Sequence, residues 1–230
     1  MSYSSEVLAD SPVIYYRMNE ASGDIVDSSG NGNDSTSVEG TPLYGEDGAL
    51  VVEPDDCIKV TASNSDQFVV PYNASMDVGD VLSAEAWIKR GDTSTGERAF
   101  FAKANSAFLG MLDHNIFFAR SGITGICTST ITITDTDTFH HIVATKDGSD
   151  VHLYIDGADV TGTVTNSTFT DTSDSLYVGA ENGGGYFTGW LDEIAIYDTA
   201  LSPARVLAHY QAATSEPGPE FQFVRSNLRW

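Results

Sequence analysis

Carboxylate and imidazole side chains occur at three places in the sequence where acid–base chemistry is conceivable: Glu85, His140-His141 and Asp192-Glu193. Hydrolysis of a glycosidic bond needs two carboxyl groups on one face of a site. Neighbouring residues of a strand point to opposite faces, so Asp192 and Glu193 are not expected to act as a pair. The same alternation separates the two histidines, for which packing and hydrogen bonds are favoured over zinc binding or base catalysis. Glu85 stands alone between alanines. We therefore predict that the chain is not an enzyme.

Cysteine and glycine patterns exclude other kinds of site. Cys57 and Cys127 are far apart and neither belongs to a CxxC pair, so a cysteine-ligated metal is not expected. Both are expected to be buried free thiols, with a single disulfide between strands as the alternative. The glycine run at 183–185 is not followed by a helical pattern, which excludes a phosphate-binding loop there.

The net charge of −22, from 33 acidic and 11 basic residues in a chain of 230, restricts the partners. Such a charge repels phosphate backbones and anionic membranes, so we expect no nucleic acid and no membrane among them. The longest apolar runs have the length of a strand and are too short for a transmembrane helix. The first residues, MSYSSEVLADSP, lack the pattern of a secretory signal.

Residues 139–160 show the architecture that has to position these side chains. In FHHIVATKDGSDVHLYIDGADV, two alternating stretches flank a turn at 146–150, and Asp156-Gly157 begins another turn. This pattern predicts a β-hairpin. Because an alternating strand buries one face only, the hairpin needs a second layer over its Val, Leu and Ile side chains.

Short alternating stretches recur along the chain and extend the prediction to the whole fold. In the threonine run at 128–138 we expect the threonines to face solvent and Ile131 and Ile133 to face the core. One helix is expected after Ser202 and Pro203, docked on a sheet edge and ending near residue 213. The predicted fold class is all-β, a two-sheet antiparallel jelly-roll sandwich with one short C-terminal helix. Strands are expected near 13–18, 45–52, 57–60, 68–70, 81–90, 98–103, 108–113, 116–120, 128–138, 176–179 and 189–197.

The chain divides into an acidic body at 1–213 and an extended C-terminal arm at 214–230. The arm begins with linker composition, TSEPGPE, and ends with an aromatic-rich stretch, FQFVRSNLRW. Two arginines balance two glutamates in the arm, so the body carries the whole net charge. We predict that the arm binds another surface. Its partner-binding residues are expected to be Phe221, Phe223, Val224, Arg225, Leu228, Arg229 and Trp230.

Several blocks of the body occur in the order typical of a known superfamily. They are YYRMNE at 15–20 with DSSGNGN at 27–33, AEAWIK at 84–89, FHHIVA at 139–144 with LYIDG at 153–157, and WLDEIAIY at 190–197 followed by Leu201-Ser202. Over about residues 10–212 the chain resembles the laminin-G-like, concanavalin A-like lectin/glucanase superfamily, in the form found in phage structural proteins. The resemblance implies that the body is one laminin-G-like jelly-roll domain.

The resemblance also implies a metal site. Members of the superfamily commonly hold a structural calcium, and their last strand lies against the first, which would bring Asp192 towards the oxygen-rich loop at 27–35. Carboxylate and amide oxygens suit calcium. We therefore expect a structural calcium on Asp27, Asn31, Asn33 and Asp192; the alternative is that these side chains only cap turns or lie at a strand edge. Glycosidases of the superfamily carry Glu-x-Asp-x-Glu on one strand, and this pattern does not occur here.

Aromatic residues in loops are candidates for stacking on sugars. Tyr72, Tyr186 and Phe187 occupy such positions and are the predicted ligand-binding residues. The alternative is that their rings cover the ends of the core.

The lectin-like resemblance, the missing signal pattern and the aromatic arm together predict a virion protein made in the host cytoplasm. We expect a non-enzymatic capsid decoration or tail-associated protein on the virion surface, anchored by its arm to phage capsid or tail proteins and able to bind cell-surface glycans. A homo-oligomer, dimeric or trimeric, would fit a capsid lattice. The alternative is a free or secreted, extracellular module for carbohydrate binding or adhesion. A third class, a glycosidase, would require turnover that depends on Asp192 or Glu193.

Overall fold

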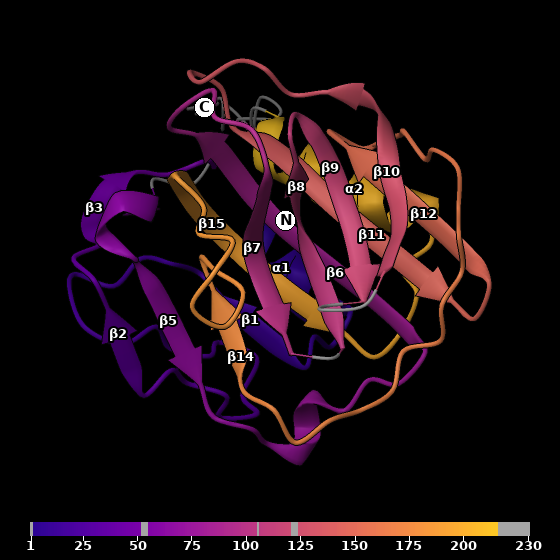
Figure 1. The fold of residues 1–230 in the computed structure, drawn as a ribbon, viewed down its shortest axis with the longest axis horizontal. Coiled ribbons are helices and arrows are strands. Elements are labelled where there is room, and N and C mark those ends of the chain that lie inside the picture. The colour runs from indigo at the N-terminus through magenta and orange to yellow at the C-terminus, as the bar shows by residue number, and fades with distance from the viewer. Residues whose placement is uncertain (1, 52–54, 105, 121–123, 216–230) are drawn as a thin grey trace, which may run out of the picture.

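The computed structural model describes residues 2–51, 55–104, 106–120 and 124–215, and it forms a sandwich of two sheets (Figure 1). All strand pairs within the two sheets are antiparallel. Sheet A has the order β13 (Ala158–Asp159), β12 (Asp150–Ile155), β11 (His140–Asp147), β6 (Val81–Arg90), β15 (Gly189–Tyr197), β4 (Asp56–Val60) and β3 (Leu43–Asp47), with β1 (Ile14–Tyr16) paired to β15. Sheet B has the order β10 (Thr124–Thr132), β9 (Asn115–Arg120), β8 (Ala107–Leu112), β7 (Glu97–Lys103), β14 (Leu176–Val178), β5 (Gln67–Val70) and β2 (Ser37–Glu39). Two short 3-10 turns, η1 (Ala62–Asn64) and η2 (Ala74–Met76), flank β5.

The predicted hairpin is strands β11 and β12. Ile142 pairs with Ile155 and Ala144 with Leu153, and all four side chains are buried in the main core. Strand β6 lies on the other side of β11, in register from His140 to Asp147. The hairpin therefore belongs to sheet A, and sheet B is the second layer that its apolar side requires.

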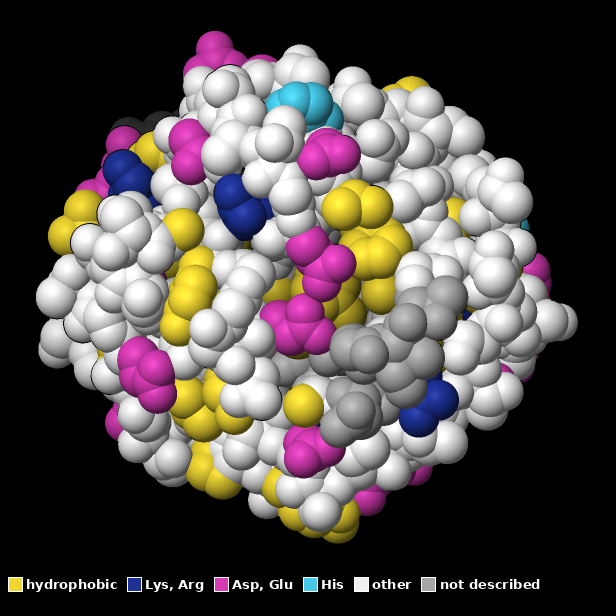
Figure 2. Space-filling view, in the orientation of Figure 1, with side chains coloured by type: hydrophobic (Ala, Val, Ile, Leu, Met, Phe, Trp, Pro, Cys, Tyr) yellow, Lys and Arg dark blue, Asp and Glu magenta, His cyan; other side chains and the backbone are white. Residues whose placement is uncertain are grey.

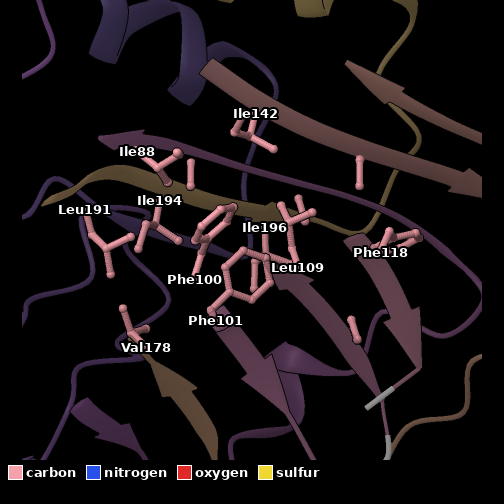
Figure 3. Close-up of a cluster of buried hydrophobic side chains, with 14 of the residues drawn as sticks. Ile88, Phe100, Phe101, Leu109, Phe118, Ile142, Val178, Leu191, Ile194 and Ile196 are labelled. Carbon is pink, nitrogen blue, oxygen red and sulfur yellow. The ribbon is translucent and has the colours of Figure 1, made fainter. Parts of the chain in front are cut away.

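The interior between the sheets is apolar. Figure 3 shows Ile88, Leu191 and Ile196 of sheet A facing Phe100 and Leu109 of sheet B. All five are buried. Truncating one such phenylalanine to alanine removes about 3–5 kcal/mol of stability in a packed core. The prediction of a two-sheet antiparallel jelly-roll sandwich is confirmed.

Two helices cover the outer face of sheet A, on the side away from sheet B (Figure 1). Helix α2 (Pro203–Thr214) begins as predicted, with the Ser202 hydroxyl accepting the backbone N–H of Arg205. Helix α1 (Tyr3–Ala9) was not predicted, because its seven residues are too few for a periodic pattern. The described residues therefore form two α-helices, and α2 packs on the sheet face and not on its edge. Neither helix of the described residues has the length and apolarity to cross a bilayer.

The threonine run is less regular than predicted. Ile133 is buried, but Ile131 is 50% exposed. The pairing of β10 with β9 shifts register between Thr128 and Thr132, so the alternation breaks before Ile131. Cys57 and Cys127 are both buried free thiols, which confirms the favoured alternative.

Candidate functional site

An irregularity in strand β15 places two consecutive carboxylates in one cluster. The pairing of β15 with β6 shifts register between Asp192 and Ala195, and Glu193 has a φ of 48°. The resulting bulge changes the direction in which these side chains point. Carboxylate oxygens of Asp55, Asp192 and Glu193, here called the acidic centre, all lie within 4.8 Å of one another. The prediction that Asp192 and Glu193 cannot form a pair, which assumed a regular strand, is therefore wrong.

The acidic centre is buried, and its negative charge exceeds the positive charge beside it. Asp192 and Glu193 are fully buried. Oδ2 of Asp192 accepts the backbone N–H of Ala49 at 2.8 Å, whereas Oδ1 has no hydrogen-bond partner among the described residues. Glu193 accepts hydrogen bonds from the hydroxyl of Tyr15 and, at 3.4 Å, from Nε of Arg17. The same guanidinium lies 3.2 Å from the third carboxylate, so one arginine faces three carboxylates.

Electrostatics at the acidic centre favour uptake of positive charge. Burial raises the pKa of Asp192 and of Glu193 well above the ordinary values, and the neighbouring carboxylates raise both further. A proton or a cation is therefore needed to neutralise the excess charge. Three carboxylates, one of them with an orphaned buried oxygen, fit a hard divalent cation such as calcium. A hollow beside Asp55 is lined by further oxygen-bearing residues, Asn19, Asp47, Gly48 and Asp56.

The oxygen-rich loop predicted to bind calcium is held by its own hydrogen bonds. The Asp27 carboxylate accepts the backbone N–H groups of Tyr15 and Asn33, each at 3.0 Å. The amides of Asn31 and Asn33 donate to the carbonyl of Val13 at 3.2 and 2.8 Å. Asp27 does not belong to the acidic centre. Asp192 therefore lies in the acidic centre without the three loop residues predicted to share its calcium. Asp27 accepts backbone N–H groups, and the two asparagines tie the loop to Val13.

Glu85 occupies a second buried centre on the same face of sheet A. Its carboxylate accepts from His141 at 3.0 Å, from His209 of α2 at 3.1 Å, and from the hydroxyl of Tyr197. The other nitrogen of His209 lies 2.9 Å from Asp10, just after α1. We call these five residues the Glu85 network. The expectation that Glu85 stands alone is wrong, because its partners come from distant segments.

The Glu85 network is compensated internally. Burial by itself raises the pKa of Glu85, but the charge of His209 and the hydrogen bonds of both histidines hold it well below the ordinary value. Burial likewise lowers the pKa of His209, while Glu85 and Asp10 hold it above the ordinary value. Glu85, His141 and His209 are each fully buried. The network therefore joins α1 and α2 to the sheet and offers no opening to a substrate. His140 points elsewhere, to Asp156 at 2.8 Å, as the alternation predicted.

The three predicted ligand-binding aromatics have different environments. Tyr72 is 40% exposed; its hydroxyl donates to Asp77 at 2.8 Å, and the ammonium of Lys103 lies 5.2 Å from its ring centroid. Tyr186 is half-buried. Phe187 is buried in the main core and packs edge-on against Phe100. The structure thus leaves Tyr72 and Tyr186 accessible, whereas Phe187 covers the core.

The arm lies largely outside the described residues. Thr214 is the last residue of α2 and residue 215 caps it. The predicted partner-binding residues Phe221, Phe223, Val224, Arg225, Leu228, Arg229 and Trp230 fall within 216–230, outside the part of the chain that the structure describes.

Sequence comparison identifies the family of the chain. A family model described as the concanavalin A-like lectin/glucanases superfamily, laminin-G type, matches residues 62–207. The chain therefore belongs to this superfamily. No curated protein sequence matches it.

Solved structures with the same fold include binding domains of larger proteins. Domain 4 of AbnA, an extracellular arabinanase from Geobacillus stearothermophilus solved with arabinotriose, has a TM-score of 0.66 at 20% identity, over 87% of this chain and 98% of that one. The binding domain of Paraclostridial Mosquitocidal Protein 1 has a TM-score of 0.67 at 18% identity, over 89% and 53%. A structure of botulinum neurotoxin type C, whose cell entry depends on interaction with two ganglioside molecules, has a TM-score of 0.65 at 13% identity, over 89% of this chain and 52% of that one. The chain spans about half the length of these toxin chains.

Proposed function

We propose that this chain is a non-catalytic carbohydrate-binding domain. The observation that carries the proposal is the likeness to domain 4 of the arabinanase, which the chain matches over nearly its whole length and which was solved with arabinotriose. The toxin structures add binding domains of the same fold. Sugars bind to such folds through exposed aromatic rings flanked by polar groups, and Tyr72 with Asp77 provides one such place.

The arrangement of the carboxylates supports a non-catalytic role. A glycosidase needs an acid and a nucleophile or base on either side of a bound sugar. Asp192 and Glu193 are fully buried, and Glu193 is already bound by Tyr15 and Arg17. Glu85 is sealed beneath the helices. In the described residues these carboxylates are therefore placed to hold charge within the fold.

Affinity electrophoresis tests the proposed binding. The full chain is run through gels containing arabinan, β-glucan or polygalacturonate, with serum albumin as a non-binding reference. Retardation by at least one polysaccharide, reduced in a Tyr72→Ala variant with unchanged melting temperature, is the expected result. Release of reducing sugar from the same polysaccharides, abolished by Asp192→Asn, would contradict the non-catalytic assignment, and no retardation by any of them would contradict carbohydrate binding.

A bound calcium is the second part of the proposal. The chemistry of the acidic centre suits it, and Asp55, Asp192 and Glu193 would hold the ion. Calcium there would neutralise two carboxylates that are otherwise unfavourably buried, and so would fix the bulge of β15 against the segment near Ala49. Its expected role is structural.

We propose further that the carbohydrate-binding body is displayed on a phage particle, on its capsid or tail, and held there by the arm. The support is the contrast in the sequence between an acidic body and a neutral, aromatic-rich stretch after a Pro-Gly linker. Truncation after residue 215 tests this. The expected result is unchanged polysaccharide binding with loss of sedimentation with particles; equal sedimentation of the truncated chain would leave only a free binding module. Light scattering of both chains reports whether a homo-oligomer depends on the arm.

A further inference from the structure

A row of alternating aromatic and lysine side chains crosses the outer face of sheet A beside the helices. Trp190 of β15 pairs with Lys59 of β4 on one side and with Lys89 of β6 on the other. The two ammonium groups lie 4.4 and 4.2 Å from the Trp190 ring centroid, and Lys89 also lies 4.5 Å from the Phe139 ring. We call Phe139, Lys89, Trp190 and Lys59 the lysine–aromatic strip.

The strip holds the two lysines of the chain that are not buried. The chain has four lysines. Lys103 and Lys146 are buried and paired with aspartates at 3.0 Å. Lys59 and Lys89 are half-exposed, and within the described residues neither forms an ion pair. Over the opposite face of the molecule, acidic side chains are widespread and lysine or arginine shows at few places (Figure 2).

Among the described residues, the four side chains of the strip lie half-exposed beside the helices. Phe139 packs against the cluster beneath the helices, as does Tyr210, which stacks on Trp87 at 6.0 Å. Trp190 is oriented by a hydrogen bond from its indole N–H to Glu46 at 3.1 Å. Cation–aromatic contacts hold each ammonium in place while leaving its hydrogen-bond donors available. Two pre-positioned cations without carboxylate partners complement an anionic ligand, and the aromatic rings between them complement a sugar.

We propose that the lysine–aromatic strip binds an acidic saccharide, with the ammonium groups of Lys59 and Lys89 on its carboxylate or sulfate group and the exposed edges of Trp190 and Phe139 against the sugar ring. This inference rests on the proposed carbohydrate-binding function, places a second sugar contact apart from Tyr72, and names the ligand class of that contact. The negative body repels a polyanion at long range, so binding is measured at 0.15 M salt, where a screening length of about 8 Å reduces that repulsion.

Titration of the full chain with three probes tests the inference: polygalacturonate for carboxylate, dextran sulfate for sulfate and arabinan as the neutral reference. Lys59→Gln/Lys89→Gln should weaken binding of the preferred acidic probe about tenfold, as expected for two partly exposed ion pairs. Lys59→Arg/Lys89→Arg should retain it, because the charge remains. The matched control, Arg98→Gln/Arg120→Gln, removes the same charge from β7 and β9 of sheet B and should change binding less than about twofold. Melting curves verify that each variant folds.

The outcomes separate this inference from the function on which it rests. Weaker binding in the lysine variant alone supports the strip, and the probe affected tells carboxylate from sulfate. Equal loss in the arginine control, or no loss in either, overturns the strip as the site. Binding of arabinan only overturns the acidic ligand but leaves carbohydrate binding intact. Binding of none of the three overturns both.

Discussion

Two carboxylate centres lie buried on the same face of sheet A, and they are neutralised in different ways. The Glu85 network contains His209, whose pKa is raised, and its charge together with the hydrogen bonds of the network holds the pKa of Glu85 low. The acidic centre has three carboxylates and one arginine, and the pKa values of Asp192 and Glu193 are raised. The comparison teaches that burial alone does not decide the charge of a carboxylate; its partners do. One centre has a countercharge within the fold, and the other is suited to an ion from solution.

The largest effect on stability is expected at the Glu85 network. Glu85→Gln keeps the shape of the side chain but removes the charge that faces His141 and His209. Breaking a buried, hydrogen-bonded ion pair by removing one partner costs about 3–5 kcal/mol. Urea unfolding should show this loss, whereas Asp147→Asn, at the exposed end of β11, should change stability by less than about 0.5 kcal/mol. Similar values for the two variants would mean that the network does not stabilise the fold.

The next largest effect on stability is expected at the acidic centre. Calcium at a hundredfold excess over its Kd should stabilise the chain by about 2.7 kcal/mol, and a chelator should reverse this. Asp192→Asn should abolish the response, because it alters the carboxylate with the orphaned oxygen. Asp27→Asn is the matched control: it loosens the loop but should keep the calcium response. The reverse pattern, a response lost with Asp27 and kept without Asp192, would return the ion to the loop predicted from the sequence.

The pH dependence without calcium separates the two centres. Carboxyl groups with raised folded pKa values bind more protons when folded, so stability falls as pH rises above their ordinary values. Between pH 5 and 6 the chelated protein should lose up to about 1.4 kcal/mol for each of Asp192 and Glu193. Asp192→Asn/Glu193→Gln should remove this slope.

Above pH 6 the Glu85 network adds its own dependence. Because the pKa of His209 is raised on folding, its contribution is complete below the ordinary histidine pKa and is lost as pH rises through the folded value. Glu85, whose pKa is lowered, contributes above its ordinary value and loses this contribution only in strong acid. A double variant of the acidic centre that kept the full slope at pH 5–6 would show that the two carboxylates are not the titrating groups.

The two centres also mark the limit of prediction from sequence. The alternation of apolar and polar residues predicted most of the strands and the sandwich, because every second side chain of a strand points to the same face. The same rule failed at Asp192 and Glu193, because a bulge changes the direction of a side chain without a clear sequence signal. Asp55 could not be assigned, since it is brought to the centre by the pairing of β4 with β15. The adjacency of two acids in an otherwise apolar strand was the one available signal.

The contacts between the two helices could not be predicted from the sequence either. Helix α1 is too short to show periodicity, and it lies almost 200 residues from its partner in α2. Cys57 and Cys127 were assigned correctly, since distance and absence of a motif already favoured free thiols. Glu85 shows the general difficulty: nothing near it in sequence indicates that two histidines and a tyrosine converge on it.

The smallest effect is expected where the Glu85 network reaches the surface. Arg205 of α2 pairs with Asp10 at 2.8 Å and with Glu6 of α1 at 2.9 Å, and its side chain is 33% exposed. Partly exposed pairs contribute about 0.2–1 kcal/mol and are screened by salt. Arg205→Gln should therefore destabilise the chain by less than about 1 kcal/mol at low salt and by much less in 1 M sodium chloride, while the effect of Glu85→Gln should persist in both. If the two variants responded to salt alike, the Glu85 carboxylate would have to be in contact with solvent, and the Glu85 network would not be sealed from ions.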